Sequence, residues 1–362
     1  MSGALSRSLL ESLGWTAELD ADLAASPFAV ADPSLVPARI VVQQRGRWLT
    51  VGPAGELSAD IRGRLRRRGV ANIELPAVGD WVLVAPRPYE GRATIAAVLP
   101  RRSALVRKVA GQVTEAQVVA ANVDVVLVTV PLDSDINVRR VERQLTSVWE
   151  SGATPVIVAT KSDRRGSRDI TELQAAALGV EVIVLSALTG NGVAQLQPWL
   201  GAGTTLALLG PSGAGKSTLT NALLGEERMA TGGVREGDAK GRHTTSHREL
   251  VVLPGGAMLI DTPGLRELAL WDADEGLAAT FTDIEELAAQ CRFANCTHGN
   301  EPQCAIRAAL ADGTLDLVRL EAWRKLESEL AHLARKQDVR SAAEEKRKLA
   351  ILVRQSQARI RP

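Results

Sequence analysis

The chain has 362 residues, of which 45% are hydrophobic, and this is enough to bury the cores of two or three domains. The formal net charge of +1 hides a patchwork, because residues 62–68 and the end of the chain from 346 are basic while residues 272–286 are acidic. No stretch reaches the ~18 apolar residues of a membrane helix, and the start lacks a secretory leader. We therefore expect a soluble cytoplasmic protein with no membrane partner.

The N-terminal part of the chain predicts a small barrel. Residues 1–34 are irregular, and we expect a lead-in with one short helix. Short apolar runs then follow from 36 to 106 with turns between them, one of them at Gly79-Asp80, and no long helical pattern interrupts them. Such spacing predicts a closed barrel of the OB type, with the basic run 62–68 in a loop between strands. An SH3-like barrel is the alternative that the pattern leaves open.

From about residue 115 the pattern changes to apolar strands that alternate with amphipathic helices. Continuous apolar strands of this kind predict a parallel sheet with helices on both faces. Ligands of such sheets bind at the carboxyl ends of the strands. The predicted strands are 123–130, 155–160, 180–185, 205–209, 249–253 and 258–261, and the clearest predicted helices are 138–149 and 170–177.

A phosphate-binding loop is predicted where the sequence matches G-x-x-x-x-G-K-[ST]. It follows the strand at 205–209 and opens a helix at 217–224, which is the context that such a loop requires. Lys216 should reach the β- and γ-phosphates, and the Ser217 hydroxyl should ligate Mg²⁺. The loop by itself does not choose between GTP and ATP. The predicted phosphate-binding residues are Gly210, Pro211, Ser212, Gly213, Ala214, Gly215, Lys216, Ser217 and Thr218.

A second motif for the phosphate side, DTPG at 261–264, closes the strand at 258–261. Asp261 should hold Mg²⁺ through water, and the Gly264 amide should meet the γ-phosphate. The segment 231–247 between the two motifs is rich in glycine and charge, as expected of a switch loop. The additional Mg²⁺ ligand is expected there, and the sequence leaves open whether it is Thr244 or Thr245.

The base-reading motif is TKSD, which follows the strand at 155–160. The Asp163 carboxylate could accept hydrogen bonds from two donors of guanine, a pairing that adenine does not offer. The Lys161 stem could lie along the base, and the backbone of Ser186-Ala187-Leu188, after the next strand, could donate to guanine O6. Together these motifs favour GTP over ATP. The predicted base-site residues are Thr160, Lys161, Ser162, Asp163, Ser186, Ala187 and Leu188.

The three cysteines all lie between 291 and 304, and with one histidine they predict a metal site. Three thiolates and one imidazole suit Zn²⁺, and four protein ligands leave no open position, so the ion should be structural. Thr282 and Glu285 have the spacing of a capping box at a helix start. Arginine and lysine are frequent after the cluster, which favours RNA as a partner. The predicted zinc ligands are Cys291, Cys296, His298 and Cys304.

These motifs stand in an unusual order, with the base motif before the phosphate loop and DTPG last. In this order, with the KGRHTT segment at 240–245 and the cysteine cluster, the chain resembles the circularly permuted GTPases that depend on the small ribosomal subunit (RsgA, also called YjeQ). The resemblance covers about residues 36–335. It implies hydrolysis of GTP to GDP and phosphate, with stimulation by the small subunit. It also implies a role in late maturation of that subunit and contact with its 16S rRNA. The family resemblance agrees with zinc as the metal of the cysteine cluster.

Two positions depart from what the resemblance implies. The base motif of the family usually begins with Asn, which ties the base loop to the phosphate loop, so Thr160 should weaken that tie and lower nucleotide affinity. Many GTPases have a Gln after the last glycine of DTPG, where this chain has Leu265. Leucine cannot orient the attacking water, so intrinsic hydrolysis should be slow. His243 and His247 are candidates to orient that water.

We therefore predict a multidomain α/β protein: an N-terminal OB-type barrel, a circularly permuted P-loop GTPase domain and a C-terminal helical zinc-binding module. Its cofactors would be one structural Zn²⁺ and Mg²⁺ bound with GTP, and we expect a monomer. A nucleotide-gated RNA-binding clamp with little turnover, and an ATPase that shares the phosphate loop, are the alternatives. The predicted segments are a lead-in at 1–34, the barrel at 35–110, the GTPase domain at 111–275, the zinc domain at 276–337 and a basic helical or disordered tail at 338–362.

Overall fold

The computed structural model describes residues 2–44, 46–61, 73–108, 116–166, 169–177, 179–227, 248–261 and 274–331. The chain divides into two compact units, residues 1–269 and residues 270–362. Each unit has hydrophobic core clusters of its own. In the part of the chain that the structure describes, no helix is long and apolar enough to cross a membrane.

The first unit contains a closed β-barrel. Its strands pair in the order β1-β2-β3-β5-β4, and β4 pairs back with β1 to close the barrel. β3 and β5 are parallel, and the other neighbouring strands are antiparallel. This is the OB topology that the sequence predicts, and it excludes the SH3-like alternative. The strands are β1 (Val36–Gln44), β2 (Arg47–Gly52), β3 (Gly55–Ile61), β4 (Trp81–Arg87) and β5 (Arg92–Val98).

The N-terminal lead-in differs from the single short helix that we expect from the sequence. It forms the helices α1 (Ser2–Ser12), α2 (Ala17–Ala25) and α3 (Pro27–Ala31). Leu13 and Leu19 belong to the same buried cluster as the barrel residues. The ring of Trp15 packs edge-on against the ring of Trp81, with 4.8 Å between the ring centroids. The expectation was wrong because helices this short are stabilised by packing rather than by their own sequence.

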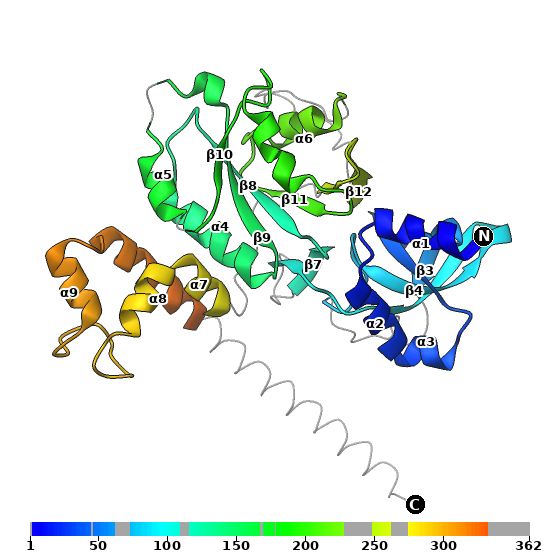
Figure 1. The fold of residues 1–362 in the computed structure, drawn as a ribbon, viewed down its shortest axis with the longest axis horizontal. Helices are drawn as coiled ribbons and strands as arrows, with labels where there is room; N and C mark the ends of the chain where they lie inside the picture. Colours follow the sequence, from blue (N-terminus) through cyan, green and yellow to red (C-terminus); the bar gives the residue numbers. More distant parts are fainter. Residues whose placement is uncertain are drawn as a thin grey trace, which may run out of the picture. The chain divides into compact units, whose positions relative to one another are not determined.

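The α/β part of the first unit has a sheet of order β10-β9-β8-β11-β13-β12 (Figure 1). All of these strands are parallel except β12, which runs antiparallel to β13. The elements are β8 (Val125–Pro131), α4 (Val138–Glu150), β9 (Thr154–Thr160), α5 (Thr171–Ala176), β10 (Val182–Val184), β11 (Thr205–Leu209), α6 (Lys216–Leu224), β12 (Arg248–Val252) and β13 (Met258–Asp261).

Alternate residues of the central strands enter different cores, as the continuous apolar pattern predicts. Val126 and Val128 of β8 share one cluster with residues of α4 and α5. Val125 and Leu127 share another with Leu219 of α6. Helices therefore cover both faces of the parallel sheet.

Two features of the first unit lie outside the sequence predictions. The strands β6 (Ala104–Lys108) and β7 (Ala116–Ala121) form a separate antiparallel pair after the barrel. In addition, β12 pairs with β1 of the barrel, so the barrel and the α/β domain share one continuous sheet. The side chain of Arg248 in β12 donates to the side chain of Gln43 in β1 at 3.0 Å.

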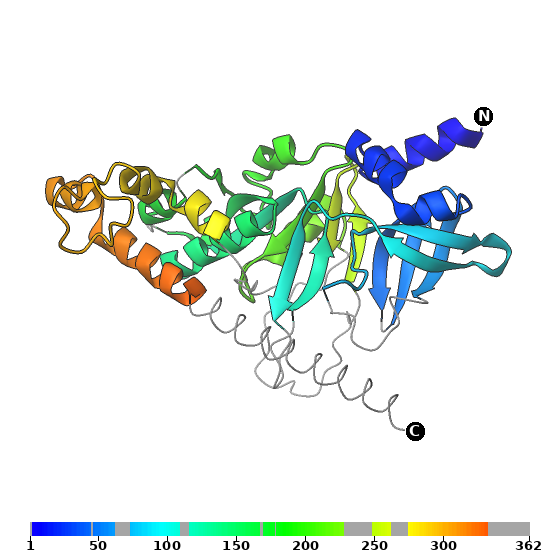
Figure 2. The same cartoon turned by 90° about the horizontal axis from the view of Figure 1, so that it is seen from below.

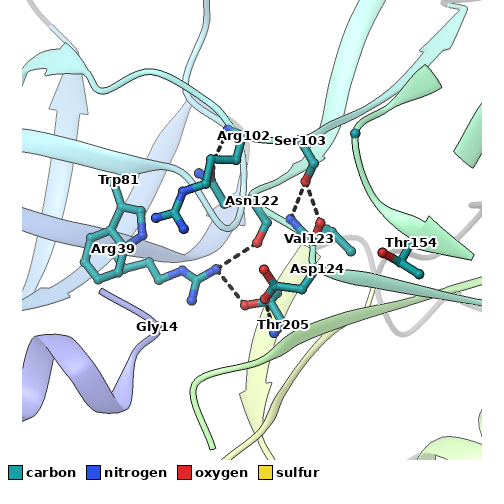
Figure 3. Close-up of a pocket in the computed structure, with 11 residues that line it drawn as sticks. Gly14, Arg39, Trp81, Arg102, Ser103, Asn122, Val123, Asp124, Thr154 and Thr205 are labelled. Carbon is teal, nitrogen blue, oxygen red and sulfur yellow. Dashed lines mark hydrogen bonds between the residues drawn. The ribbon is translucent and has the colours of Figure 1, made fainter. Parts of the chain in front are cut away.

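A buried arginine of β1 reinforces this joint (Figure 3). Arg39 is 1% exposed, and its guanidinium lies 5.3 Å from the ring centroid of Trp81. It also lines a cavity of about 300 Å³. Its nitrogens donate to four segments: the carbonyls of Leu13, Gly79 (3.3 Å) and Asn122 (3.3 Å), and the hydroxyl of Thr205 (2.8 Å).

The second unit is helical around its own core. Phe281, Ile284 and Ile306 are fully buried in it, and Trp323 packs beside them. The predicted capping box is wrong, because Phe281 and not Thr282 is the N-cap residue of this helix, and the Thr282 hydroxyl donates to carbonyls of the preceding helix. The helices are α7 (Asp274–Thr280), α8 (Thr282–Ala288), α9 (Ala305–Asp312) and a further helix at residues 317–331.

Replacement of Gly79 should destabilise the first unit more than replacement of Gly55, although both have φ of +89°. A Cβ at Gly79 would lie 2.1 Å from the carbonyl oxygen of Ala121, whereas at Gly55 it would meet nothing within 4 Å. We expect Gly55→Ala to lower the free energy of unfolding by about 1 kcal/mol through backbone strain, and Gly79→Ala by about 2–4 kcal/mol. Urea denaturation of the full chain measures both changes. Equal losses for the two variants would contradict the close approach of Gly79 to the carbonyl of Ala121.

Candidate nucleotide site and metal centre

The phosphate-loop segment connects β11 to α6 along a path that requires glycine at its start. Gly210 has φ of +150°, and a Cβ there would lie 2.2 Å from the Thr129 hydroxyl of β8. That hydroxyl donates to the Leu209 carbonyl at 3.0 Å, which holds the end of β11 against β8. The loop then turns into α6, whose N-terminal amides favour an anion.

Lys216, the first residue of α6, reaches back across this loop. Its ammonium donates to the carbonyls of Gly210 and Pro211, both at 2.7 Å. Gly215, directly before it, is left-handed with φ of +86°. The cation therefore lies at the loop where the sequence places phosphate.

The base-reading segment begins where β9 ends, and it contacts the phosphate loop. Thr160 is 2% exposed, and its hydroxyl donates to the Ala214 carbonyl at 2.7 Å. A hydroxyl thus makes the link for which the family usually has Asn, so the tie that we expected to be weakened is present. The consequence for affinity stays a prediction.

Lys161 is held in place by a partner that sequence reasoning missed. Its backbone is left-handed, with φ of +58°, and its ammonium pairs with Asp133 at 2.7 Å. Asp133 follows β8, the neighbour of β9, so the signal in the sequence is an acidic residue just after an apolar strand. Asp163 lies in the short 3₁₀ turn Ser162–Arg164, and its side chain is 23% exposed.

The third predicted segment, residues 186–188, follows β10. Ser186 is 1% exposed, and its backbone N–H donates to the Asn191 carbonyl at 2.8 Å. Leu188 is 69% exposed. The Ser162 amide donates to the Leu185 carbonyl at 3.2 Å, so the segment 160–163 contacts the residue directly before the segment 186–188.

Asp261 ends β13, which lies beside β11 in parallel register, with Ala207 opposite Ile260. The structure therefore brings the segments 160–163, 186–188 and 210–218 and Asp261 to the carboxyl edge of one sheet, the edge where α/β proteins bind ligands. Ser217 and Asp261 supply oxygen atoms of the kind that Mg²⁺ prefers. The predicted residues His243, Thr244, Thr245, His247, Gly264 and Leu265 lie outside the described residues, as do the basic run 62–68 and the tail 338–362.

The predicted metal ligands of the second unit converge. The ligand atoms of Cys291, Cys296, His298 and Cys304 all lie within 4.8 Å of one another. The sulfurs of Cys291 and Cys304 are each 3.6 Å from Nδ1 of His298 and 3.9 Å from each other. Bonds of about 2.0–2.3 Å to a tetrahedral ion would place such atoms about 3.3–3.8 Å apart, so the group fits Zn²⁺.

The surrounding loop presents the imidazole to the sulfurs. His298 has a left-handed backbone with φ of +57°, and its carbonyl accepts from Arg324 at 2.8 Å. Hydrogen bonds from Thr297 and the loop amides lower the pKa of Glu301 to about 2, so this carboxylate stays ionised and holds the loop. Burial raises the pKa of the Cys296 thiol to about 11, which a divalent cation would reverse.

Comparisons with known proteins place these features in one family. The family model of RsgA GTPase matches residues 98–271, and a model described as 50S ribosome-binding GTPase matches residues 205–346. "Small ribosomal subunit biogenesis GTPase RsgA" of Opitutus terrae is 47% identical, over 91% of this chain and 92% of its own length. The protein of that name from Syntrophotalea carbinolica is 44% identical over 96% of both chains.

Solved structures agree with this placement. The crystal structure of YjeQ from Thermotoga maritima matches 82% of this chain and 99% of its own, with a TM-score of 0.63 and 25% identity. YloQ, a circularly permuted GTPase, shares the fold with a TM-score of 0.58. A circularly permuted fold therefore explains why the base motif precedes the phosphate loop and DTPG comes last. The chain belongs to the RsgA GTPase family and is a GTP hydrolase.

Proposed function

We propose that this GTPase acts in biogenesis of the small ribosomal subunit in the cytoplasm, and that the subunit stimulates its hydrolysis of GTP. The curated relatives that cover most of the chain are named for small ribosomal subunit biogenesis. The observation that carries the proposal is the shared sheet, in which an OB-type barrel continues into the nucleotide-binding domain through β1 and β12. OB-type barrels bind nucleic acid, so this arrangement suits a GTPase that contacts 16S rRNA, and we infer that it does so as a monomer.

Within the nucleotide site, each segment has a separate task. Asp163 and the backbone of residues 186–188 would read guanine, and Lys161, steadied by Asp133, would lie along the base. The loop amides and Lys216 would bind the β- and γ-phosphates and stabilise the charge that develops on them. Mg²⁺, held by Ser217, by Thr244 or Thr245, and by Asp261 through water, would neutralise the phosphate oxygens.

Hydrolysis would proceed by in-line attack of water, and this chain has Leu265 where many GTPases have the water-orienting Gln. Leucine cannot form a hydrogen bond with that water. We infer slow intrinsic turnover, with the missing contact supplied when the subunit reorders the switch or contributes a group. His243 and His247 stay candidates for orienting the water, with Gly264 as the amide that meets the γ-phosphate.

The zinc proposal rests on the convergence of Cys291, Cys296, His298 and Cys304. Four protein ligands close the coordination shell, so the ion would stabilise the fold and take no part in catalysis. The cluster lies between α8 and α9, so it would hold together the helices of the second unit.

The first test of the proposed function is GTP hydrolysis with and without purified small subunits. Because Leu265 leaves the attacking water unheld, we expect slow release of phosphate by the chain alone and an increase of about tenfold or more with small subunits. Large subunits are the control. Absence of stimulation would favour an RNA-binding clamp with little turnover, and equal displacement of labelled GTP by ATP and GDP would favour an ATPase.

The link between the base and phosphate loops can be tested at Thr160. Thr160→Val keeps the shape of the side chain but removes the hydroxyl that donates to Ala214, and it leaves that carbonyl without its partner. We expect about 5- to 10-fold weaker binding of GDP, which corresponds to about 1–1.4 kcal/mol. Titration with a fluorescent GDP measures it. Thr160→Ser retains a hydroxyl and should bind like the wild type; a valine variant of unchanged affinity would contradict the link.

The metal site predicts one zinc ion per chain by elemental analysis of protein purified without chelators. Cys304→Ser removes a buried ligand and should lose the ion and the helical structure of the second unit, measured by circular dichroism. Nucleotide binding should persist, since the first unit has its own core. Arg307→Ala, at an exposed position of α9, is the control that should keep zinc. Retention of zinc by the serine variant would contradict the assignment.

A further inference from the structure

The tip of the β4–β5 hairpin carries the only tyrosine of the chain, Tyr89. Its relative exposure is 106%, whereas the barrel tryptophans Trp48 and Trp81 are at most 5% exposed. The hairpin, drawn in cyan, extends from the barrel (Figure 2). An aromatic ring that the fold does not use for packing is free to contact a partner.

The backbone at Tyr89 is held in a defined turn. Pro88, Tyr89 and Glu90 form a 3₁₀ turn that begins with the proline. Gly91 closes the turn in the left-handed conformation, with φ of +63°, and its N–H donates to the Pro88 carbonyl at 3.0 Å. The Gly91 carbonyl accepts from the Ser58 amide of β3 at 3.0 Å, which ties the turn to the barrel. The backbone that carries the ring is therefore already ordered, so binding needs little additional ordering of the backbone.

Positive charge flanks the ring. Arg87 and Arg92 lie directly opposite each other in the β4–β5 ladder, an arrangement that is unfavourable for like charges. Glu90 pairs with Arg87 at 3.0 Å and neutralises it. Across the described ranges of the chain, no carboxylate pairs with Arg92, which is exposed. A cation thus lies three residues along the chain from an exposed ring, as suits a nucleotide with its base and its phosphate.

We propose that Tyr89 is a stacking platform for an unpaired RNA base and that Arg92 contacts an adjacent phosphate. In OB-type barrels the β4–β5 loop is one of the loops that bind oligonucleotides, and this hairpin is that loop. We favour RNA over a protein partner because the exposed ring lies beside Arg92, for which the described residues offer no carboxylate partner, and a ring next to a free cation suits a base and its phosphate. The inference rests on the proposed function, because it assumes that the RNA belongs to the small subunit.

The test compares full-length variants in binding to purified small subunits, with basal GTP hydrolysis as the check on folding. Tyr89→Ala should bind about tenfold more weakly, and Tyr89→Phe, which keeps the ring, should bind like the wild type. Arg92→Gln should reduce the slope of log affinity against log salt by about one. Val30→Ala, at another exposed apolar position, should change nothing. All variants should keep the basal rate.

A photo-crosslinking amino acid at position 89 identifies the partner. Adducts with rRNA support the proposal, and adducts only with ribosomal protein overturn it. Unchanged binding of Tyr89→Ala, or equal losses for Tyr89→Ala and Tyr89→Phe, also overturns stacking while the proposed function stands. If the wild-type chain itself does not bind small subunits, the proposed function fails, and this inference fails with it.

Discussion

The buried guanidinium of Arg39 fixes the position of the barrel relative to the GTPase domain. Burial lowers the pKa of Arg39 to about 10, so the group is still charged at neutral pH and needs hydrogen-bond partners wherever it lies. Those partners come from the N-terminal segment, the loop before β4, the residue after β7 and the start of β11. Movement of any one segment would leave a buried charge with an unmet donor, which is costly. One side chain therefore holds these segments in register.

The same joint reaches the strands that carry the nucleotide site. Thr205 begins β11 and Met258 begins β13, and both lie against Arg39. These parallel strands end at the phosphate loop and at Asp261. The antiparallel strand β12 pairs with β1 on one side and β13 on the other. The barrel is thus attached to the strands that carry the proposed phosphate and Mg²⁺ ligands, while the proposed base-reading loops lie on the other side of β8.

The base and phosphate loops are also joined directly. Thr160 illustrates why a departure from a family pattern need not remove an interaction. A threonine hydroxyl is shorter than an asparagine amide, but it reaches the Ala214 carbonyl because β9 brings its last residue close to the loop. Lys161 and Asp133 form a second contact of this kind, between the ends of neighbouring strands. Both contacts depend on strand order, so neither follows from the motifs alone.

Local patterns were sufficient for much of this protein. The phosphate loop, the cysteine and histidine spacing and the change from barrel to alternating strands and helices could be predicted because each depends on short-range chemistry or on periodicity. The N-terminal helices, the pairing of β1 with β12, the partners of Arg39 and the exposure of Tyr89 could not. These features arise when segments far apart in the chain pack together, since a short helix, a buried charge or an edge strand is stable only with the partner that covers it. Sequence thus identified the chemistry of the sites, and long-range packing decided how the barrel and the nucleotide edge are connected.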